Sequence, residues 1–249
     1  MKRTVLVTGA SKGIGRAIAL RLAADGFTLL VHYHSDRVGA EATLAELDAA
    51  GGAGRLIQFD IADRPGCRQA LEADMALHGP YYGVVNNAGI GIHASFADTS
   101  EAQFDQLMNI HLKGPFFLTQ ALLPLLNNPS SVILCGSVSA RIGLPTSSVY
   151  AASKAALLSL ARTLSAELLP RGIRVNGLSP GPVETPAFTK TGLSDEALNA
   201  MMAEIIKLVP LGRMGSTTEL AKAALYLASD ESSYTVGTEL LVDGGMGSL

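Results

Sequence analysis

Three residues in the second half of the chain, Ser137, Tyr150 and Lys154, have side chains that together could move a proton onto a carbonyl oxygen. Tyr150 and Lys154 stand four positions apart at the start of a predicted helix, so they share one face of it. A free phenol has a pKa of about 10, and a neighbouring ammonium lowers the pKa of that phenol because it favours the phenolate. Ser137 follows a β-like run, from where its hydroxyl could reach the same oxygen. Because the Tyr-x-x-x-Lys spacing alone is a weak signal, its meaning depends on what positions it.

The elements that must position these residues are predicted as alternating strands and helices. Buried-strand patterns occupy residues 3–8, 27–33, 56–60, 83–86, 131–137, 174–179 and 239–242. Helical patterns occupy residues 16–22, 37–50, 64–78, 100–126, 150–169 and 216–229. This alternation predicts an α/β fold: a single-domain, Rossmann-type, doubly wound parallel sheet of about seven strands with helices on both faces. We expect a cofactor-binding part over about 1–90, a catalytic and substrate-binding part over about 91–249, and a lid over about 187–213.

A glycine-rich turn separates the first predicted strand from the first predicted helix. Its sequence is Thr8-Gly9-Ala10-Ser11-Lys12-Gly13-Ile14-Gly15. Glycines permit a tight turn and a close approach of the backbone to a pyrophosphate, whose negative charge is stabilised at a helix N-terminus. The strand–turn–helix context favours a dinucleotide-binding site here, and the alternative is a turn that only packs the helix against the strand.

The end of the second predicted strand bears on the choice between NAD and NADP. A site for NAD is expected to place Asp or Glu there to hold the ribose 2′-hydroxyl. The chain has Tyr33-His34-Ser35 at that place, and Lys12 and Arg37 are cations that could meet a 2′-phosphate. We therefore favour NADP(H), while Asp36 leaves open a shifted loop that would use its carboxylate for NAD.

Two more strand ends carry candidate cofactor contacts. Asp60 and Ile61 stand at the C-terminal end of the third predicted strand and are placed to touch an adenine, although an acid that caps the next helix would look the same. Asn87, Ala88 and Gly89 follow the fourth, where small and amide residues would let a cofactor lie against the sheet, or would form a plain polar turn. Ligands of open α/β sheets bind beyond the carboxyl ends of the strands, which is where all these motifs lie.

Composition and charge exclude several classes of function. The formal net charge is −3 and no basic tract is present, so we expect no nucleic-acid partner. No stretch approaches the ~20 apolar residues that span a bilayer, so we expect no membrane partner and a cytoplasmic protein. The two cysteines, Cys67 and Cys135, lack metal-type spacing and are interpreted as buried thiols. His32 and His34 could share a strand face, but without a third ligand we expect no metal site.

Taken together, these motifs resemble the short-chain dehydrogenase/reductase family over essentially the whole chain, and most closely its 3-oxoacyl-(acyl-carrier-protein) reductases. The resemblance rests on the glycine turn, Asn86-Asn87-Ala88-Gly89, Ser137, Tyr150-x-x-x-Lys154, Asn176-x-x-x-Pro180-Gly181 and the segments Gly212-Arg213-Met214-Gly215 and Val242-Asp243-Gly244-Gly245. It implies an NADP(H)-dependent reduction of a ketone to a secondary alcohol, in which hydride leaves the nicotinamide and Tyr150 acts as general acid/base.

The resemblance also implies roles for the remaining site residues. Lys154 would lower the pKa of Tyr150 and bind the nicotinamide ribose, and Ser137 would hydrogen-bond the substrate oxygen. Val183 and Thr185, after Pro180 and Gly181, are similar to residues that hold the nicotinamide carboxamide. The implied substrate is a small or cyclic carbonyl or an acyl thioester, with acyl carrier protein as a candidate partner. The implied assembly is a homotetramer, with a dimer as the alternative.

One position departs from the family pattern. Where the family usually has an asparagine that anchors a water in a proton relay, this chain has His111, and Asn109 lies two residues earlier. Imidazole can donate and accept a hydrogen bond, so the relay could persist with a pH dependence that asparagine would not give. A broken relay would leave a slow enzyme or a catalytically silent nucleotide-binding sensor or scaffold. An NAD-linked secondary alcohol dehydrogenase is the other rival interpretation.

The first and second halves of the chain resemble different members of the family. Residues up to Gly89 are most similar to the acyl-carrier reductases, and the later part is more similar to enzymes that reduce small or cyclic ketones. A recombined chain and ordinary divergence both account for this pattern.

Overall fold

A parallel seven-stranded sheet forms the middle layer of the protein, whose computed structural model describes residues 3–186 and 194–249. The strand order is β3-β2-β1-β4-β5-β6-β7, and every neighbouring pair is parallel. The strands are β1 (Thr4–Val7), β2 (Thr28–Tyr33), β3 (Ala53–Gln58), β4 (Tyr81–Asn86), β5 (Leu126–Cys135), β6 (Ile173–Pro180) and β7 (Glu239–Val242). From β1 the chain adds β2 and β3 on one side, and from β4 it adds β5, β6 and β7 on the other. The crevice at the carboxyl ends of β1 and β4 is therefore the topological switch point, where such sheets bind ligands.

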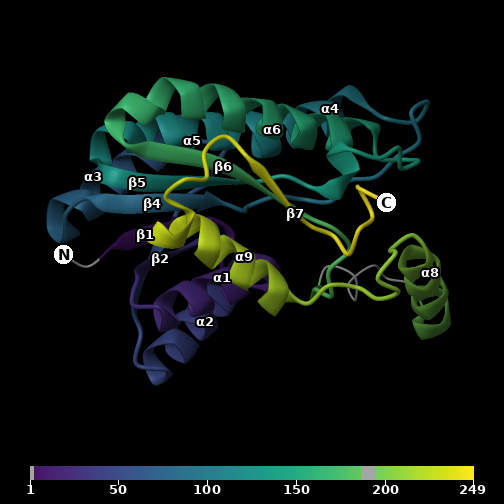
Figure 1. Ribbon diagram of the computed structural model, residues 1–249, viewed down its shortest axis with the longest axis horizontal. Helices are drawn as coiled ribbons and strands as arrows, with labels where there is room; N and C mark the ends of the chain where they lie inside the picture. The colour runs from purple at the N-terminus through teal and green to yellow at the C-terminus, as the bar shows by residue number, and fades with distance from the viewer. Residues whose placement is uncertain (1–2, 187–193) are drawn as a thin grey trace.

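Helices cover both faces of the sheet, as Figure 1 shows. Those of the described residues are α1 (Gly13–Ala24), α2 (Arg37–Ala49), α3 (Arg64–His78), α4 (Glu101–Met108), α5 (Gly114–Leu122), α6 (Ser148–Leu168), α8 (Asp195–Lys207) and α9 (Thr217–Ala228). One core packs side chains of α1, α2 and α9 against the sheet, and a second packs those of α3, α5 and α6 against it. The α/β, doubly wound prediction is confirmed.

Local sequence accounts for where most helices begin. Asp36, Asp63, Ser100, Ser194 and Ser216 accept a backbone N–H in the first turns of α2, α3, α4, α8 and α9. Such side chains satisfy donors that a helix N-terminus otherwise leaves unpaired. Lys12, which precedes α1, makes no side-chain cap among the described contacts. The first backbone N–H groups of α1 therefore point at the switch point without a protein cap.

The predicted helix over 100–126 is interrupted. A π-helical turn, Asn109–Lys113, lies between α4 and α5, and it contains His111. The following strand, β5, begins at Leu126 and ends at Cys135, so the predicted span of 131–137 was wrong at both ends. β3 also begins and ends earlier than predicted, at Ala53 and Gln58. These shifts arise because pairing with a neighbouring strand extends or ends a strand regardless of local apolar content.

The predicted lid over 187–213 is described in part, since residues 187–193 lie outside the described residues. Within the described part, Asp195–Lys207 form α8, which stands off the carboxyl edge of the sheet in Figure 1 and has no buried residue. Half-buried residues of α8 follow one helix face: Leu198, Met201, Met202, Ile205 and Ile206. The lid function stays a prediction. None of the helices in the described ranges is long and apolar enough to cross a membrane.

Candidate active site

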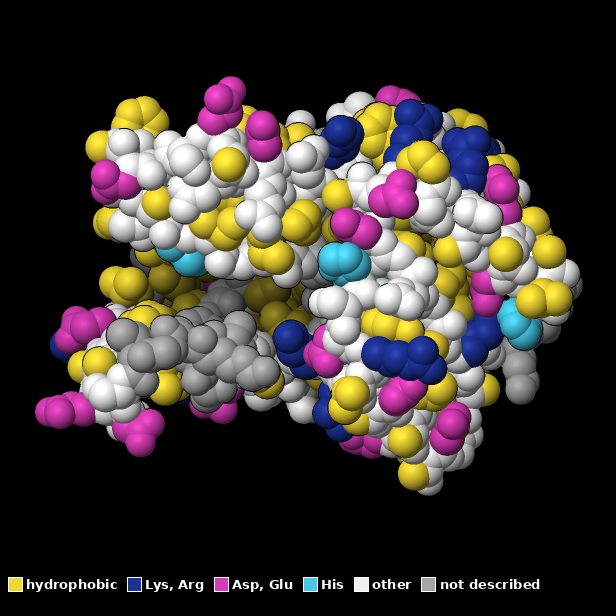
Figure 2. Space-filling model, turned by 180° about the vertical axis from the view of Figure 1, so that it is seen from behind, with side chains coloured by type: hydrophobic (Ala, Val, Ile, Leu, Met, Phe, Trp, Pro, Cys, Tyr) yellow, Lys and Arg dark blue, Asp and Glu magenta, His cyan; other side chains and the backbone are white. Residues whose placement is uncertain are grey.

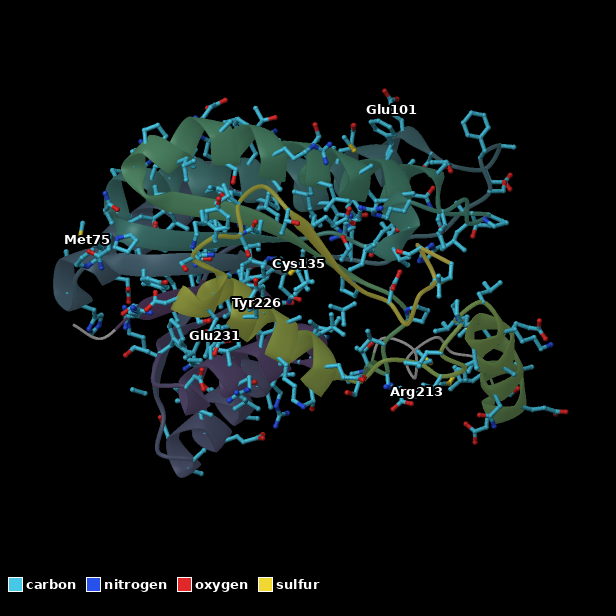
Figure 3. All side chains as sticks on the ribbon, in the orientation of Figure 1. Met75, Glu101, Cys135, Arg213, Tyr226 and Glu231 are labelled. Atoms are coloured by element: carbon cyan, nitrogen blue, oxygen red, sulfur yellow. The ribbon has the colours of Figure 1, made fainter. Side chains whose placement is uncertain are left out.

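Ser137, Tyr150 and Lys154 meet where β5 and α6 come together. Ser137 follows the end of β5 and precedes a short 3-10 turn, while Tyr150 and Lys154 lie in the first two turns of α6, which begins at Ser148. The Ser137 hydroxyl lies near enough to the Tyr150 phenol to lower the pKa of that phenol. The Lys154 ammonium lies 5.8 Å from the centre of the Tyr150 ring and donates to the Cys135 carbonyl at 2.9 Å. Figure 3 labels Cys135 near the middle of the molecule, so this contact anchors Lys154 at the sheet.

Ser139 fixes the orientation of the Ser137 hydroxyl. Both its backbone N–H and its side-chain hydroxyl donate to Ser137 Oγ, at 3.2 Å and 2.9 Å. Because Ser137 Oγ then accepts twice, its own hydrogen is free to be donated toward the phenol. Ser139 is 5% exposed and was not among the residues predicted from the sequence. The Ser-x-Ser spacing was the signal that could have pointed to it.

Burial dominates the electrostatics of the phenol and the ammonium. Burial raises the pKa of Tyr150 above its ordinary value, and the hydrogen bond from Ser137 only partly offsets this. Burial also lowers the pKa of Lys154 from 10.5 to about 8. The sequence led us to expect a lowered pKa for Tyr150, and the free protein shows the opposite direction. The reason is that desolvation disfavours the charged form of both groups.

His111 joins the π-helical turn to two other elements. Its Nε2 accepts the Ile90 N–H at 3.0 Å, and its Nδ1 lies 3.1 Å from Ser153 Oγ. The Ser153 hydroxyl donates to the Tyr150 carbonyl at 2.7 Å, so Nδ1–H of His111 must be the donor to Ser153 Oγ. Burial, followed by the charge of Lys154, lowers the pKa of His111 to about 3. His111 is therefore a neutral ring with both nitrogens bonded within the protein.

The glycine turn is built as a cofactor-binding turn requires. Gly9 and Gly13 have φ of +65° and +56°, a region that favours glycine. A Cβ on Gly15 would stand 2.3 Å from the Gly9 carbonyl oxygen, so α1 packs against the turn more closely than any side chain allows. Ser11 is buried beside Ala10, while Lys12 and Ile14 are more exposed. A pyrophosphate would meet backbone N–H groups here, and this geometry fits a dinucleotide.

Asn87 ties the end of β4 to the glycine turn. Its side-chain amide donates to the Thr8 carbonyl at 2.9 Å and to the Gly9 carbonyl at 3.3 Å. Thr8 Oγ1 in turn accepts the N–H groups of Asn87 and Ala88, each at 2.9 Å. Gly89 lies against His111, because a Cβ added to Gly89 would stand 3.0 Å from His111 Nε2. Sequence reasoning placed these residues at the cofactor, and the structure gives Asn87 a role in shaping the turn.

The cations predicted to meet a 2′-phosphate are paired with acids in the structure. Lys12 Nζ lies 3.8 Å from an Asp36 carboxylate oxygen, and Arg37 Nε donates to Glu41 at 2.7 Å. Both cations are exposed at the rim of the switch point. Asp36 caps α2, so its carboxylate accepts the Gly39 N–H. A bound phosphate would compete with these acids for the two cations, and their contact with a 2′-phosphate stays a prediction.

His34 and Asp60 face each other across the ends of β2 and β3, with His34 Nε2 3.9 Å from a carboxylate oxygen of Asp60. Asp60 accepts the Ala62 N–H at 2.9 Å, and the cap of α3 is Asp63. The alternative reading of Asp60 as a helix cap was therefore wrong. Ile61 is 7% exposed and lies in the core beneath this corner.

The remaining predicted cofactor residues follow β6. Gly181 lies so close to the C-terminal segment that a Cβ would stand 2.6 Å from the Asp243 Cα. Pro180 ends β6, and Val183 pairs with Gly215 in an isolated parallel bridge. The methyl group of Thr185 would lie 3.8 Å from a Cβ on Gly13, which brings this segment beside the glycine turn. The predicted cofactor residues thus lie at the carboxyl ends of β1, β2, β3, β4 and β6.

His93 is a second residue at the site that sequence reasoning missed. Its ring centre lies 5.7 Å from that of Tyr150, and its Nδ1 lies 3.2 Å from Ser147 Oγ. The loop that carries it is tied to the loop before α6 by the Ala94 N–H, which donates to the Thr146 carbonyl at 3.0 Å. Thr146 has a φ of 63°, a strained conformation for a β-branched residue. Only the approach of the two loops in space puts His93 here.

An apolar hollow lies beside α8. Figure 2 shows a hollow between the part of the surface that carries α8 and the rest of the molecule, with hydrophobic side chains at its floor. Arg213, labelled in Figure 3 on the segment between α8 and α9, is paired with Glu219 at 2.7 Å. The described residues contain no cluster of three or more side chains able to hold a metal ion.

Comparison with known proteins gives matches over nearly the whole chain. The family model described as Enoyl-(Acyl carrier protein) reductase matches residues 9–247. The 3-oxoacyl-(acyl-carrier-protein) reductase FabG of Aggregatibacter actinomycetemcomitans is 36% identical over 249 residues, which is 99% of this chain and 100% of the relative. The 3beta-hydroxysteroid dehydrogenase 1 of Eggerthella lenta is 37% identical over 247 residues, which is 98% of this chain and 93% of the relative.

A solved structure shows the same architecture. The crystal structure of a gluconate 5-dehydrogenase from Burkholderia cenocepacia in complex with NADP and tartrate has a TM-score of 0.91 to this chain. The sequence identity is 31%, and the match covers 100% of this chain and 97% of that chain.

Proposed function

The chain belongs to the short-chain dehydrogenase/reductase family, and from that premise we propose that it is an NADP(H)-dependent ketoreductase. It is an oxidoreductase of a family that uses a nicotinamide cofactor. In the proposed reaction, reduced nicotinamide supplies a hydride to the carbonyl carbon and Tyr150 supplies a proton to the oxygen. The products are a secondary alcohol and the oxidised cofactor, and solvent returns the proton to the phenolate.

The observation that carries this proposal is the convergence of Ser137, Tyr150 and Lys154 at the switch-point rim. The raised pKa of Tyr150 keeps the phenol protonated in the free protein, as a proton donor must be. As charge develops on the phenol oxygen, the Ser137 hydroxyl would stabilise it, and we propose that the Lys154 ammonium, 5.8 Å from the ring centre, adds to this stabilisation. Ser139 serves as a positioning residue that orients Ser137.

His111 takes a different part from the one that its position first indicated. Both ring nitrogens are hydrogen-bonded within the protein, and the pKa of the ring is lowered to about 3. It therefore does not titrate near neutral pH. Through Ser153 it contacts the backbone of Tyr150, and we propose that His111 positions α6 against the loop after β4.

The cofactor is proposed to lie along the rim from β3 to β6. The uncapped N-terminus of α1 would hold the pyrophosphate, the corner formed by Asp60 and Ile61 the adenine, and Val183 and Thr185 the nicotinamide amide. Lys12 and Arg37 would give up their ion pairs with Asp36 and Glu41 and bind the 2′-phosphate instead. The NADP complex of the gluconate 5-dehydrogenase supports this choice.

The substrate is proposed to be a 3-oxoacyl thioester or a similar small or cyclic ketone. The match to a 3-oxoacyl-(acyl-carrier-protein) reductase supports a thioester, with acyl carrier protein as a candidate partner, and the match to a hydroxysteroid dehydrogenase supports a cyclic ketone. The hydrophobic floor of the hollow suits an apolar substrate body in either case. A homotetramer remains the proposed assembly, with a dimer as the alternative.

The test is a steady-state screen of NADPH and NADH oxidation with 3-oxoacyl, enoyl, small and cyclic carbonyl substrates. We expect that at least one class of ketone is reduced, with NADPH oxidised faster than NADH. This activity should be lost in Tyr150→Phe. Turnover of enoyl substrates alone would contradict carbonyl reduction, and faster use of NADH would favour the NAD-linked dehydrogenase. Tight NADPH binding without turnover of any carbonyl would favour the silent sensor.

A further inference from the structure

His32 is a buried histidine in the middle of the cofactor-binding half that the proposed chemistry does not use. It lies in β2, is 1% exposed, and packs against Phe59 with ring centres 4.1 Å apart and ring planes tilted by 38°. Its Nδ1 lies 3.1 Å from the Gly9 backbone nitrogen, and its Nε2 lies 3.0 Å from the Phe59 carbonyl oxygen. The ring thus bridges the glycine turn and the end of β3.

The two partners fix the tautomer of His32. A backbone N–H can only donate, so Nδ1 must carry a lone pair toward Gly9, and a carbonyl can only accept, so Nε2 must carry the proton toward Phe59. Burial lowers the pKa of His32 to about 4, so the ring is neutral near pH 7. Any other protonation state would place two donors or two acceptors face to face.

The backbone of His32 adds a third link to the same turn. Its carbonyl oxygen accepts the Ala10 N–H at 2.9 Å. Gly9 and Ala10, two neighbouring residues of the glycine turn, are therefore both held by this one residue. On its other side, Phe59 immediately precedes Asp60 and Ile61, the proposed adenine corner. His32 connects the two walls between which the adenosine half of the cofactor would lie.

We propose that His32 is a positioning residue for dinucleotide binding, which holds the Gly9 N–H through Nδ1 and so presets the conformation of the glycine turn. The inference rests on the proposed function, because it assigns a role within that cofactor site. Gly9 has a φ of +65°, and the direction of its N–H depends on that unusual conformation. A turn that loses this hydrogen bond must be ordered again by the cofactor, which weakens binding.

Two substitutions separate this role from plain structural support. In His32→Asn the side-chain oxygen can take the place of Nδ1 and accept the Gly9 N–H. In His32→Gln the longer amide can take the place of Nε2–H and donate to the Phe59 carbonyl, which leaves Gly9 unpaired. Both variants replace a buried ring by a neutral amide, so each is the matched control of the other.

The experiment measures the dissociation constant of NADPH by titration of its fluorescence, together with urea unfolding of each protein. We expect His32→Asn to bind within about threefold of the wild type and His32→Gln roughly tenfold more weakly than His32→Asn, because an unpaired buried donor costs that much. Equal dissociation constants for the two variants, or weaker binding by His32→Asn, would overturn the inference.

A measurement on the wild type needs no variant to fold. Nitrogen-15 NMR of the histidine rings at pH 7 should show His32 with Nδ1 unprotonated and Nε2 protonated, and the opposite tautomer would overturn the inference. A wild type that binds neither NADPH nor NADH would overturn the proposed function and this inference together. Tight wild-type binding with equal variants would overturn the inference alone.

Discussion

Replacing Lys154 with methionine should make the free protein more stable while it removes the activity. Lys154 is 5% exposed, and its pKa falls from 10.5 to about 8 in the folded protein. That difference corresponds to roughly 3 kcal/mol at about 1.36 kcal/mol per pKa unit. Methionine has a similar length and no charge to desolvate, and the lost hydrogen bond to the Cys135 carbonyl costs about 1 kcal/mol. The net gain expected at pH 7 is about 2 kcal/mol of unfolding free energy.

The pH dependence of that gain follows from proton binding. Below pH 8 both the folded and the unfolded chain carry the ammonium, so the folded state bears the full desolvation penalty. Between about 8 and 10.5 the unfolded chain binds more protons, so the stability of the wild type rises with pH. The advantage of Lys154→Met should therefore shrink from pH 7 to pH 10.

The assay is urea unfolding of both proteins at pH 7 and pH 10, followed by circular dichroism, with ketone reduction measured in parallel. Lys222 lies exposed on α9, so Lys222→Met is the control and should change the unfolding free energy by less than about 0.5 kcal/mol. If Lys154→Met proved less stable than the wild type at pH 7 with an unchanged dependence on urea, the argument from buried charge would be refuted.

Three further predictions concern the phenol, the cofactor and His111. Tyr150→Phe should lower kcat roughly 100- to 10,000-fold, the range of general acid catalysis, while the dissociation constant of NADPH stays within twofold; a loss of binding would mean that the phenol is structural. Arg37→Asp should raise KM for NADPH far more than KM for NADH, and an equal effect on both would contradict the 2′-phosphate site. Because the pKa of His111 is lowered to about 3, His111 should not titrate between pH 5 and 7, and the pH profiles of kcat/KM of the wild type and His111→Asn should have the same shape over that range. A transition seen in the wild type and absent from His111→Asn would show that His111 does titrate there.

Elements with local boundary signals were predicted well from the sequence. The helix over 64–78 was predicted with the same ends that α3 has, because Asp63 caps it and Gly79 follows its last residue. β5 was predicted five residues too short at its start, since residues 127–130 are polar and contain a proline. Pairing of Leu126 with Tyr81 begins that strand, and no local pattern announces a contact between segments so far apart.

The same distinction applies to the site. Ser137, Tyr150, Lys154 and the glycine turn carry motifs that are legible in the sequence, and they meet at one rim. Two residues were missed: Ser139, which donates a hydrogen bond to Ser137, and His93, whose ring lies beside that of Tyr150. Motifs report the groups whose chemistry a site needs, whereas the groups that orient them can have many identities and come from any segment that the fold brings near.

The hydrogen bonds of the buried polar groups show where the cofactor should have its largest energetic effect. The ring nitrogens of His32 and His111 are all bonded within the protein. Lys154 has three N–H donors, and its hydrogen bond among the described residues is to the Cys135 carbonyl. The hydroxyl groups of a nicotinamide ribose at the rim would supply acceptors for the remaining donors. Binding should therefore relieve part of the penalty that burial imposes on this ammonium.

This difference makes cofactor stabilisation depend on Lys154. Saturating NADPH should raise the melting temperature of the wild type by more than that of Lys154→Met, because only the wild type gains charged hydrogen bonds on binding. Differential scanning fluorimetry at several NADPH concentrations checks this, with Tyr150→Phe as a control that retains the ammonium. An equal rise in the wild type and Lys154→Met would mean that Lys154 does not touch the cofactor, and its buried charge would then have no role in this site.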